Sequence, residues 1–149
     1  MAKFIGVKMI EAVPMTAREA NDKGHRIGNH SFKEDGYEVT YPNGYKSWSP
    51  AKKFEKAYYK LEDPAGDVLK ENDIKRFIKG IENVKVGTKT TNTTLTCLTG
   101  FEVHGQAGFV KPENFDLNVG ATYARIEAED KIWEGLGFVL QWAKYGLKK

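Results

Sequence analysis

The sequence contains a single cysteine among its 149 residues, Cys97, and no long apolar run. One cysteine excludes an internal disulfide and is typical of proteins that work in a reducing compartment. Near the amino terminus, Lys8 and Glu11 interrupt the apolar stretch that a secretory signal requires. No segment approaches the length of a membrane-spanning helix. We therefore expect a soluble protein that acts inside a cell and has no membrane partner.

The chain also lacks an excess of charge of one sign. Its net charge is +3, and basic residues outnumber acidic ones by 12 to 10 in residues 1–70 and by 11 to 10 in residues 71–149. Proteins that bind nucleic-acid polymers usually concentrate lysine and arginine in one domain or arm. An excess spread this evenly predicts no nucleic-acid partner.

Sets of residues that carry catalysis are missing as well. An enzyme needs a nucleophile with a base, paired carboxylates or a set of metal ligands. The three histidines are His25, His30 and His104, and no thiol or carboxylate completes a metal set beside the first two. Cys97 lies in a predicted strand, where a small buried side chain is the favoured interpretation and a nucleophile is the alternative. We expect no enzyme, no metal and no cofactor.

The patterns that are present predict an α+β fold with an N-terminal accessory unit over residues 1–61. Alternation of apolar side chains over residues 3–13 predicts a strand, and Thr16 with Glu19 forms a capping box for a short helix. Residues 36–48 are rich in aromatic side chains on both sides of an Asn-Gly turn, which predicts a hairpin. A second helix is expected to start after this hairpin, at a Ser-Pro pair.

A second domain is expected over residues 72–149, as a small antiparallel sheet with a C-terminal helical hairpin. A helix is predicted from Asn72 to Ile81, and threonine-rich alternation after Thr93 predicts a β-hairpin. Apolar residues at steps of three and four after Pro112 predict the helices. One face of this helical region is small, and its residues are Gly120, Ala121, Ala124 and Ala128. This predicts that the sheet hairpin packs on a closely docked helix, and it leaves room for the same helix of a second copy nearby.

Aromatic rings are concentrated in the hairpin over residues 36–48, namely Tyr37, Tyr41, Tyr45 and Trp48. Rings at these spacings are typical of cross-strand pairs that stabilise a small sheet. A stacking platform for bases is the alternative interpretation.

Five residues of the second domain are candidates for binding a charged, ring-bearing ligand. Phe101 and Tyr123 supply rings, and Arg125 supplies a guanidinium group for a pyrophosphate, with an ion pair to the nearby Glu129 as its alternative role. His104 shares a strand face with Glu102 and Gln106, a face that is either a pocket wall or the solvated side of the sheet. Asn114, at a predicted helix start, adds backbone donors for an anion.

The C-terminal third of the chain also resembles a family of small bacteriophage proteins. The residues that carry the resemblance are Gly100-Phe101, Pro112, Asn114-Phe115-Asp116, Lys131-Ile132-Trp133 and Gly137-Phe138. We associate this family with decoys that sequester the cyclic ADP-ribose signal of the bacterial Thoeris defence, in a pocket formed where protomers meet. The first unit, from IGVKMIEAVPMT at residues 5–16 through SWSPAKKFEKAY at residues 47–58, resembles an N-terminal module that occurs on several phage proteins.

This resemblance implies a phage anti-defence protein of the host cell cytoplasm, which binds a cyclic ADP-ribose-type nucleotide as a homo-oligomer and does not degrade it. An adaptor that blocks a host protein through Tyr41, Tyr45 and Trp48 is the alternative. An enzyme acting on the nucleotide is the third hypothesis, and the sequence offers it no catalytic set.

Overall fold

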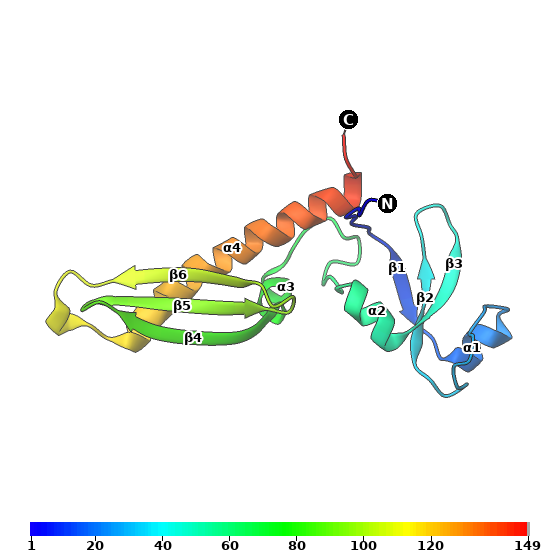
Figure 1. Ribbon diagram of the computed structural model, residues 1–149, viewed down its shortest axis with the longest axis horizontal. Coiled ribbons are helices and arrows are strands. Elements are labelled where there is room, and N and C mark those ends of the chain that lie inside the picture. The colour runs from blue at the N-terminus through cyan, green and yellow to red at the C-terminus, as the bar shows by residue number, and fades with distance from the viewer. Residues whose placement is uncertain (149) are drawn as a thin grey trace. The chain divides into compact units, whose positions relative to one another are not determined.

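The computed structural model describes residues 1–148, which divide into two compact units. Unit 1 holds residues 1–60 together with the end of the chain from Trp142, and unit 2 holds Leu61–Gln141. Each unit has its own three-stranded antiparallel sheet (Figure 1). The predicted α+β class is confirmed.

Unit 1 is a strand, a helix, a hairpin and a second helix in chain order. Its elements are β1 (Glu11–Pro14), α1 (Ala17–Asp22), β2 (Gly36–Thr40), β3 (Lys46–Pro50) and α2 (Ala51–Ala57). The Thr16 cap of α1 is confirmed, because its hydroxyl accepts a hydrogen bond from the amide of Glu19. The Glu19 carboxylate accepts from that hydroxyl and not from the Thr16 backbone amide, so only half of the predicted capping box is formed. The hairpin is confirmed too, with Gly44 in the left-handed region at φ +86°.

The first strand is shorter than the sequence predicts. Residues 1–10 have no regular structure, and β1 begins at Glu11, opposite Thr40, the last residue of β2. The alternating apolar residues before Glu11 therefore have no strand opposite them with which to pair. The helix α2 begins directly after the Ser49-Pro50 pair, as predicted, but no side chain caps it, so the Ser49 hydroxyl does not act as the cap.

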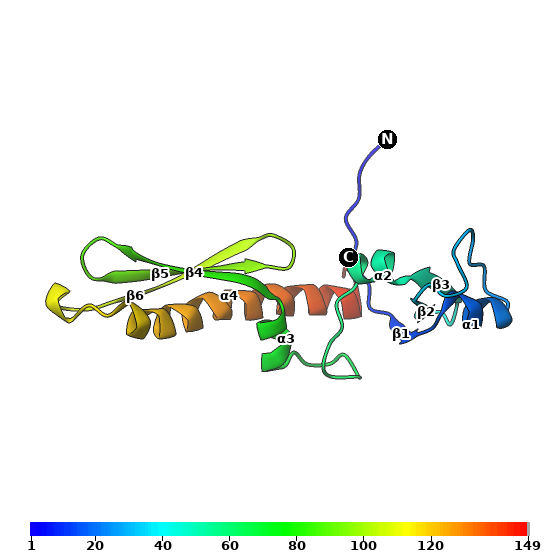
Figure 2. The same cartoon turned by 90° about the horizontal axis from the view of Figure 1, so that it is seen from below.

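Unit 2 is a sheet of three strands, in the order β4-β5-β6, packed on one long helix. Figure 2 shows the strands in one layer and the helix in the other. The elements are α3 (Glu71–Arg76), β4 (Ile78–Val86), β5 (Thr90–Cys97), β6 (Glu102–Gly108), the 3-10 turn η1 (Pro112–Asn114) and α4 (Leu117–Tyr145), the last of which belongs to unit 2 as far as Gln141.

Two predictions for this region need correction. The expected helical hairpin is a single helix of 29 residues, because Gly135 and Gly137 stay in the helix instead of ending it. The helix expected to reach Ile81 ends at Arg76, and Ile78 already belongs to β4. Here pairing with β5 outweighs the helical spacing of the isoleucines.

The core of unit 2 lies between the sheet and α4. Its buried residues are Ile74, Leu95, Cys97, Ala128 and Ile132. The small face of α4 approaches the sheet closely, so the predicted close docking of the helix on the sheet hairpin is confirmed. A Cβ atom on Gly105 of β6 would overlap the carbonyl oxygen of Ala124, and one on Gly120 would overlap the Thr91 side chain.

Candidate functional site

Within residues 61–141, the sheet of unit 2 is covered by α4 on one face, and no helix of this unit covers the other. Along β5, every second residue is buried against α4, as at Thr93 and Leu95, and the residues between them point the other way. We call this side the outer sheet face; its residues are Glu82, Val84 and Val86 of β4, Asn92, Thr94 and Thr96 of β5, and Glu102, His104 and Gln106 of β6. Glu102, His104 and Gln106 do share a strand face, and all three are exposed, which fits the solvated side of the sheet among the two alternatives.

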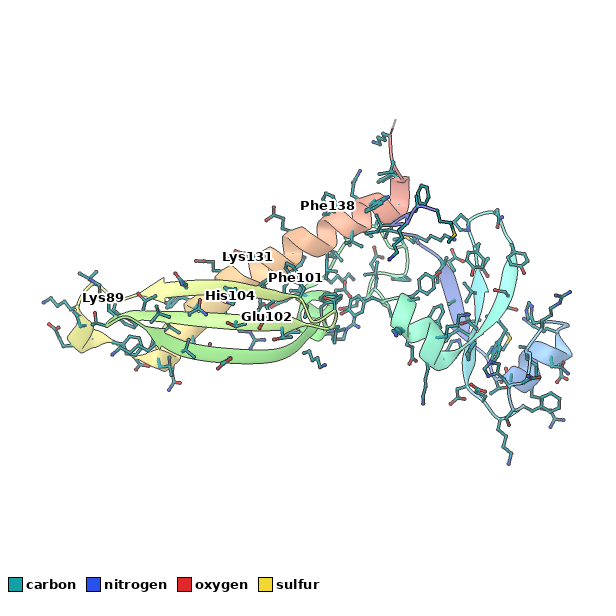
Figure 3. The ribbon with its side chains drawn as sticks, viewed as in Figure 1. Lys89, Phe101, Glu102, His104, Lys131 and Phe138 are labelled. Atoms are coloured by element: carbon teal, nitrogen blue, oxygen red, sulfur yellow. The ribbon has the colours of Figure 1, made fainter. Side chains whose placement is uncertain are left out.

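Phe101 projects from the turn at one end of this face. The turn holds Gly100 at φ +89°, and the carbonyl of Phe101 accepts a hydrogen bond from the amide of Cys97. This geometry fixes the backbone but leaves the ring 71% exposed (Figure 3). An exposed ring held by a tight turn is a suitable surface for stacking against a flat ligand.

His104 belongs to a chain of polar contacts on the outer sheet face. Its Nδ1 lies 2.9 Å from the Thr94 hydroxyl, Asn92 donates to that same hydroxyl, and Gln106 donates to Asn92. The side chains are oriented by each other and remain accessible at their outer ends. They offer both donors and acceptors to a ligand rich in hydroxyl and phosphate groups.

The other candidate residues lie elsewhere in unit 2. Tyr123 and Arg125 are on α4, in the second layer, and Arg125 donates to Glu129 at 2.6 Å, the ion pair that the sequence offered as its alternative role. Asn114 is the exposed end of η1, a turn of three residues. Because Ala124 packs on Gly105, four residues beyond Phe101, the Phe101 and Arg125 backbones are separated by roughly 13 Å of strand. One chain does not bring the five residues together.

Two side chains of α4 cover the backbone of the β6 edge. The amide of Gln106 donates to the Glu127 carboxylate at 3.3 Å, and the carbonyl of His104 accepts from the Lys131 ammonium group. The sequence alone does not predict this arrangement, because Glu127 belongs to an acidic stretch that reads as a solvated helix face. Only the packing of α4 along β6 gives these charges a partner.

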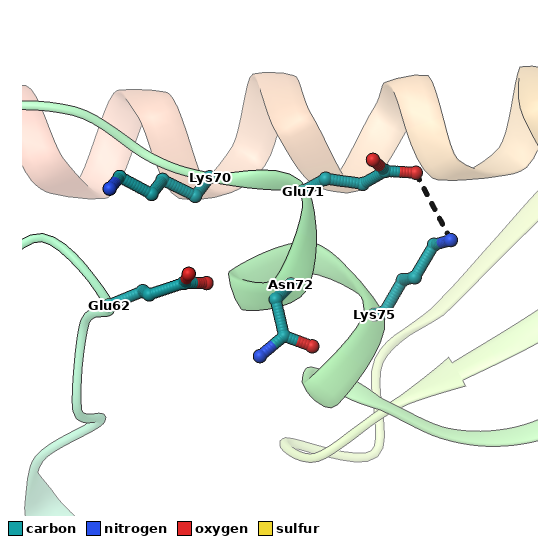
Figure 4. A pocket seen from close by; sticks show the side chains of 5 residues that line it. All are labelled: Glu62, Lys70, Glu71, Asn72 and Lys75. Atoms are coloured by element: carbon teal, nitrogen blue, oxygen red, sulfur yellow. Dashed lines mark ion pairs between the residues drawn. The ribbon is translucent and has the colours of Figure 1, made fainter.

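A shallow hollow of about 430 Å³ lies beside α3 (Figure 4). Its lining residues are Glu62, Lys70, Glu71, Asn72 and Lys75. Lys75 pairs with Glu71 at 3.1 Å, so the two charges largely satisfy each other. No aromatic ring lines the hollow, which makes it a poor site for a base.

Unit 1 contains a buried carboxylate that the sequence did not single out. Glu38 of β2 lies 2.8 Å from His25 and 3.4 Å from Lys23, and Lys46 is 3.7 Å away. The hydrogen bond from His25 lowers the pKa of the Glu38 carboxyl, and Lys23 adds to this effect. These four side chains are one acid and three bases, and they pair with one another.

The aromatic hairpin of unit 1 does not present all of its rings. Trp48 is buried and donates its indole N–H to the Met15 carbonyl at 2.8 Å, so the prediction that it forms part of an adaptor surface is wrong. Tyr41 and Tyr45 stack at 5.9 Å, as expected for a cross-strand pair. Tyr45 alone of these three is largely exposed.

Cys97 and the histidines show no further site. Cys97 is buried in the core of unit 2, and burial raises the pKa of its thiol, which favours the unreactive protonated form. Within residues 1–148, no group of three or more histidine, cysteine, aspartate or glutamate side chains is placed to hold a metal ion. No helix in the same residues is long and apolar enough to cross a membrane.

The fold defines a small α+β protein whose C-terminal part is a three-stranded sheet on one long helix. The chain belongs to the phage protein family of N4 Gp49 and phage Sf6 gene 66, whose family model matches residues 69–143, half of the chain. The expected resemblance to a bacteriophage family is confirmed at this level. No curated protein and no solved structure shows significant similarity to the chain.

Proposed function

We propose that this phage protein binds and withholds a small signalling nucleotide of the cyclic ADP-ribose type in the host cell cytoplasm, without degrading it. Two observations carry the proposal: Phe101 is exposed in the turn at one end of the sheet, and the outer sheet face carries a row of hydroxyl, amide and imidazole groups. A nucleotide needs an aromatic surface for its base and polar groups for its ribose and phosphates.

Binding in a homo-oligomer is part of this proposal. Phe101 and His104 belong to the sheet layer, whereas Tyr123 and Arg125 belong to α4. A single nucleotide reaches both sets only when a second copy supplies one of them. Such a shared site would also enclose the ligand better than a flat sheet face does, which favours slow release.

The first test measures binding of cyclic ADP-ribose by calorimetry and by thermal shift. A ligand at a hundred times its Kd stabilises a protein by about 2.7 kcal/mol. Phe101→Ala is expected to weaken binding by about 5- to 150-fold, since base stacking on an aromatic ring contributes about 1–3 kcal/mol. His104→Ala is expected to weaken it as well, through loss of a polar contact.

Phe138→Ala is the matched control for this test. Phe138 is 71% exposed, as is Phe101, but it lies on α4 (Figure 3). Its removal should leave affinity unchanged. Equal affinity of the wild-type protein, Phe101→Ala and His104→Ala would show that the ligand does not lie on the outer sheet face, and no binding of the nucleotide would end the proposal.

A second candidate function is a protein–protein adaptor that inhibits a host factor. The side of α4 away from the sheet favours it, because Val119, Tyr123 and Ile126 are exposed there at steps of four and three. An adaptor of this kind captures one stoichiometric protein from a host lysate and retains no nucleotide. Tyr123→Asp would abolish capture in this case, whereas Phe101→Ala would not.

A further inference from the structure

The two edge strands of the sheet in unit 2, β6 and β4, differ in whether their outward backbone groups have hydrogen-bond partners. At β6, the edge backbone groups of His104 and Gln106 are occupied by Lys131 and Glu127 of α4. Side chains that occupy edge groups in this way prevent another strand from pairing there. The sheet can therefore be extended at one edge only, along β4.

The backbone of β4 offers an unoccupied row of donors and acceptors. The backbone N–H and C=O of His104 point away from β5. Those of its partner Thr94 therefore point toward β4, where Glu82 is the residue opposite. The groups of Ile81, Asn83 and Lys85 then point outward. Among residues 1–148, no hydrogen bond joins these outward groups to another part of the chain.

The side chains of β4 are exposed to an unusual degree for a strand of nine residues. Ile81, Val84 and Val86 are 45%, 41% and 47% exposed. The irregular register lies near the start of the strand, between Ile78 and Gly80, and the pairing beyond it is regular. A long, regular and partly apolar edge is a template for pairing with another strand.

We propose that β4 pairs antiparallel with β4 of a second copy, so that two sheets join into one six-stranded sheet across a twofold axis. An interface of this kind is isologous, with the same residues contributed by both copies. Main-chain hydrogen bonds would hold the strands together, as in other cases of strand addition.

The charges of β4 favour its own copy as the partner. In the register centred on Asn83, Glu82 lies opposite Val84 of the second copy and Ile81 opposite Lys85, so no like charges face each other. This register pairs Gly80 through Val86 in both chains. A register centred on Glu82 would place the Glu82 carboxylates of the two chains opposite each other and is therefore disfavoured.

This dimer does not depend on the identity of the ligand. Phe101 lies at the turn between β5 and β6, away from the paired edge, so the candidate binding residues stay accessible. A monomeric protein would also remove the proposed site shared between copies, whereas nucleotide binding on the outer sheet face of one copy is still judged by its own test.

The first experiment combines the mass in solution with a disulfide trap in the full chain. Asn83→Cys places a thiol at the twofold axis, within the Cα separation that a disulfide spans. The native Cys97 is buried and does not interfere. We expect a dimer by sedimentation and an interchain disulfide for Asn83→Cys under mild oxidation. Gln106→Cys, on the occupied β6 edge, is the control and should remain uncrosslinked.

The second experiment weakens the interface while keeping the fold. Val84→Glu sets two carboxylates against Glu82 of the opposite copy, whereas Val84→Gln adds a side chain of similar size without charge. We expect the glutamate variant to dissociate at concentrations where the glutamine variant stays dimeric, with equal circular dichroism spectra. A monomer at the highest concentration that remains in solution would overturn the proposal. A dimer that crosslinks through Gln106→Cys and not through Asn83→Cys would also overturn it, as would a β4 edge occupied by an unrelated peptide strand.

Discussion

Gly105 is the residue on which the packing of α4 against the sheet depends most directly. An added Cβ atom would overlap the Ala124 carbonyl and lie 2.6 Å from the Ala128 amide nitrogen, and both are backbone atoms that no rotamer change can move. Glycine is thus required at this position by the closeness of the two layers.

We predict that Gly105→Ala lowers the free energy of unfolding by about 1–3 kcal/mol or more, as overpacking of a tight core does. Gly135→Ala is the control, because a Cβ atom added there would have no neighbour within 4 Å and the residue sits inside α4. Alanine there should stabilise the helix by about 0.5–1 kcal/mol. Urea unfolding of both variants measures the difference, and equal stabilities would contradict the close approach.

The Glu38 carboxyl makes the stability of unit 1 depend on pH in the acid range. Its lowered pKa, caused first by the hydrogen bond from His25, means that the folded state holds the carboxylate charged more strongly than the unfolded state does. In the range below the ordinary glutamate value of 4.5, the unfolded state therefore binds more protons. Stability from this group is present above that range and is lost as the pH falls through the folded pKa.

The corresponding prediction compares wild-type protein with Glu38→Gln in thermal melts at several pH values. The wild-type protein should be the more stable at pH 6, and the difference should shrink as the pH falls below about 4. Glu113→Gln, at an exposed acid of η1, is the control and should follow the wild-type curve. A difference between wild-type protein and Glu38→Gln that is independent of pH would contradict the assigned role of the ion-pair cluster.

At the scale of elements, the two edges of the sheet lead to a further prediction. Replacing both Glu127 and Lys131 by alanine frees the β6 edge while leaving the core untouched. With β4 already open, the sheet would then have two edges available for pairing, and assemblies larger than the wild-type protein are expected. Sedimentation velocity measures the mass.

Glu134→Ala provides the comparison, since it removes an exposed acid from the same helix. This variant should keep the mass of the wild-type protein. If the double variant also keeps that mass, the two side chains do not protect the edge.

The elements that can be predicted from the sequence are those with local signals. The Thr16 cap, the hairpin around Gly44 and the threonine-rich strand before Gly100 all depend on residues close together in the chain. The spacing of Ile78 and Ile81 suits a helix, and only the partner strand β5 decides otherwise. The continuity of α4 through Gly135 and Gly137 likewise depends on context beyond the helix itself.

The candidate site is predictable in part for the same reason. Alternation along β6 correctly places His104, Glu102 and Gln106 on one solvated face. It gives no information on which layer Arg125 and Tyr123 occupy, nor on the charges of α4 that occupy the β6 edge. Contacts between layers are set by tertiary packing, which periodicity alone does not encode.

At the scale of the whole molecule, the proposed function is that of a phage protein that works by capture. Unit 2 contains the matched family region and the outer sheet face, and unit 1 has its own sheet and core. Sequestration acts by mass action, so it requires tight binding and slow release and no turnover.

The most direct test of capture without chemistry is a retention experiment. The purified protein is mixed with cyclic ADP-ribose, freed of unbound nucleotide by desalting and denatured by heat, and the released material is identified by mass spectrometry. We predict intact nucleotide in a fixed ratio to the protein chain. Recovery of a hydrolysed product, or of protein that has retained nothing, would contradict capture without chemistry.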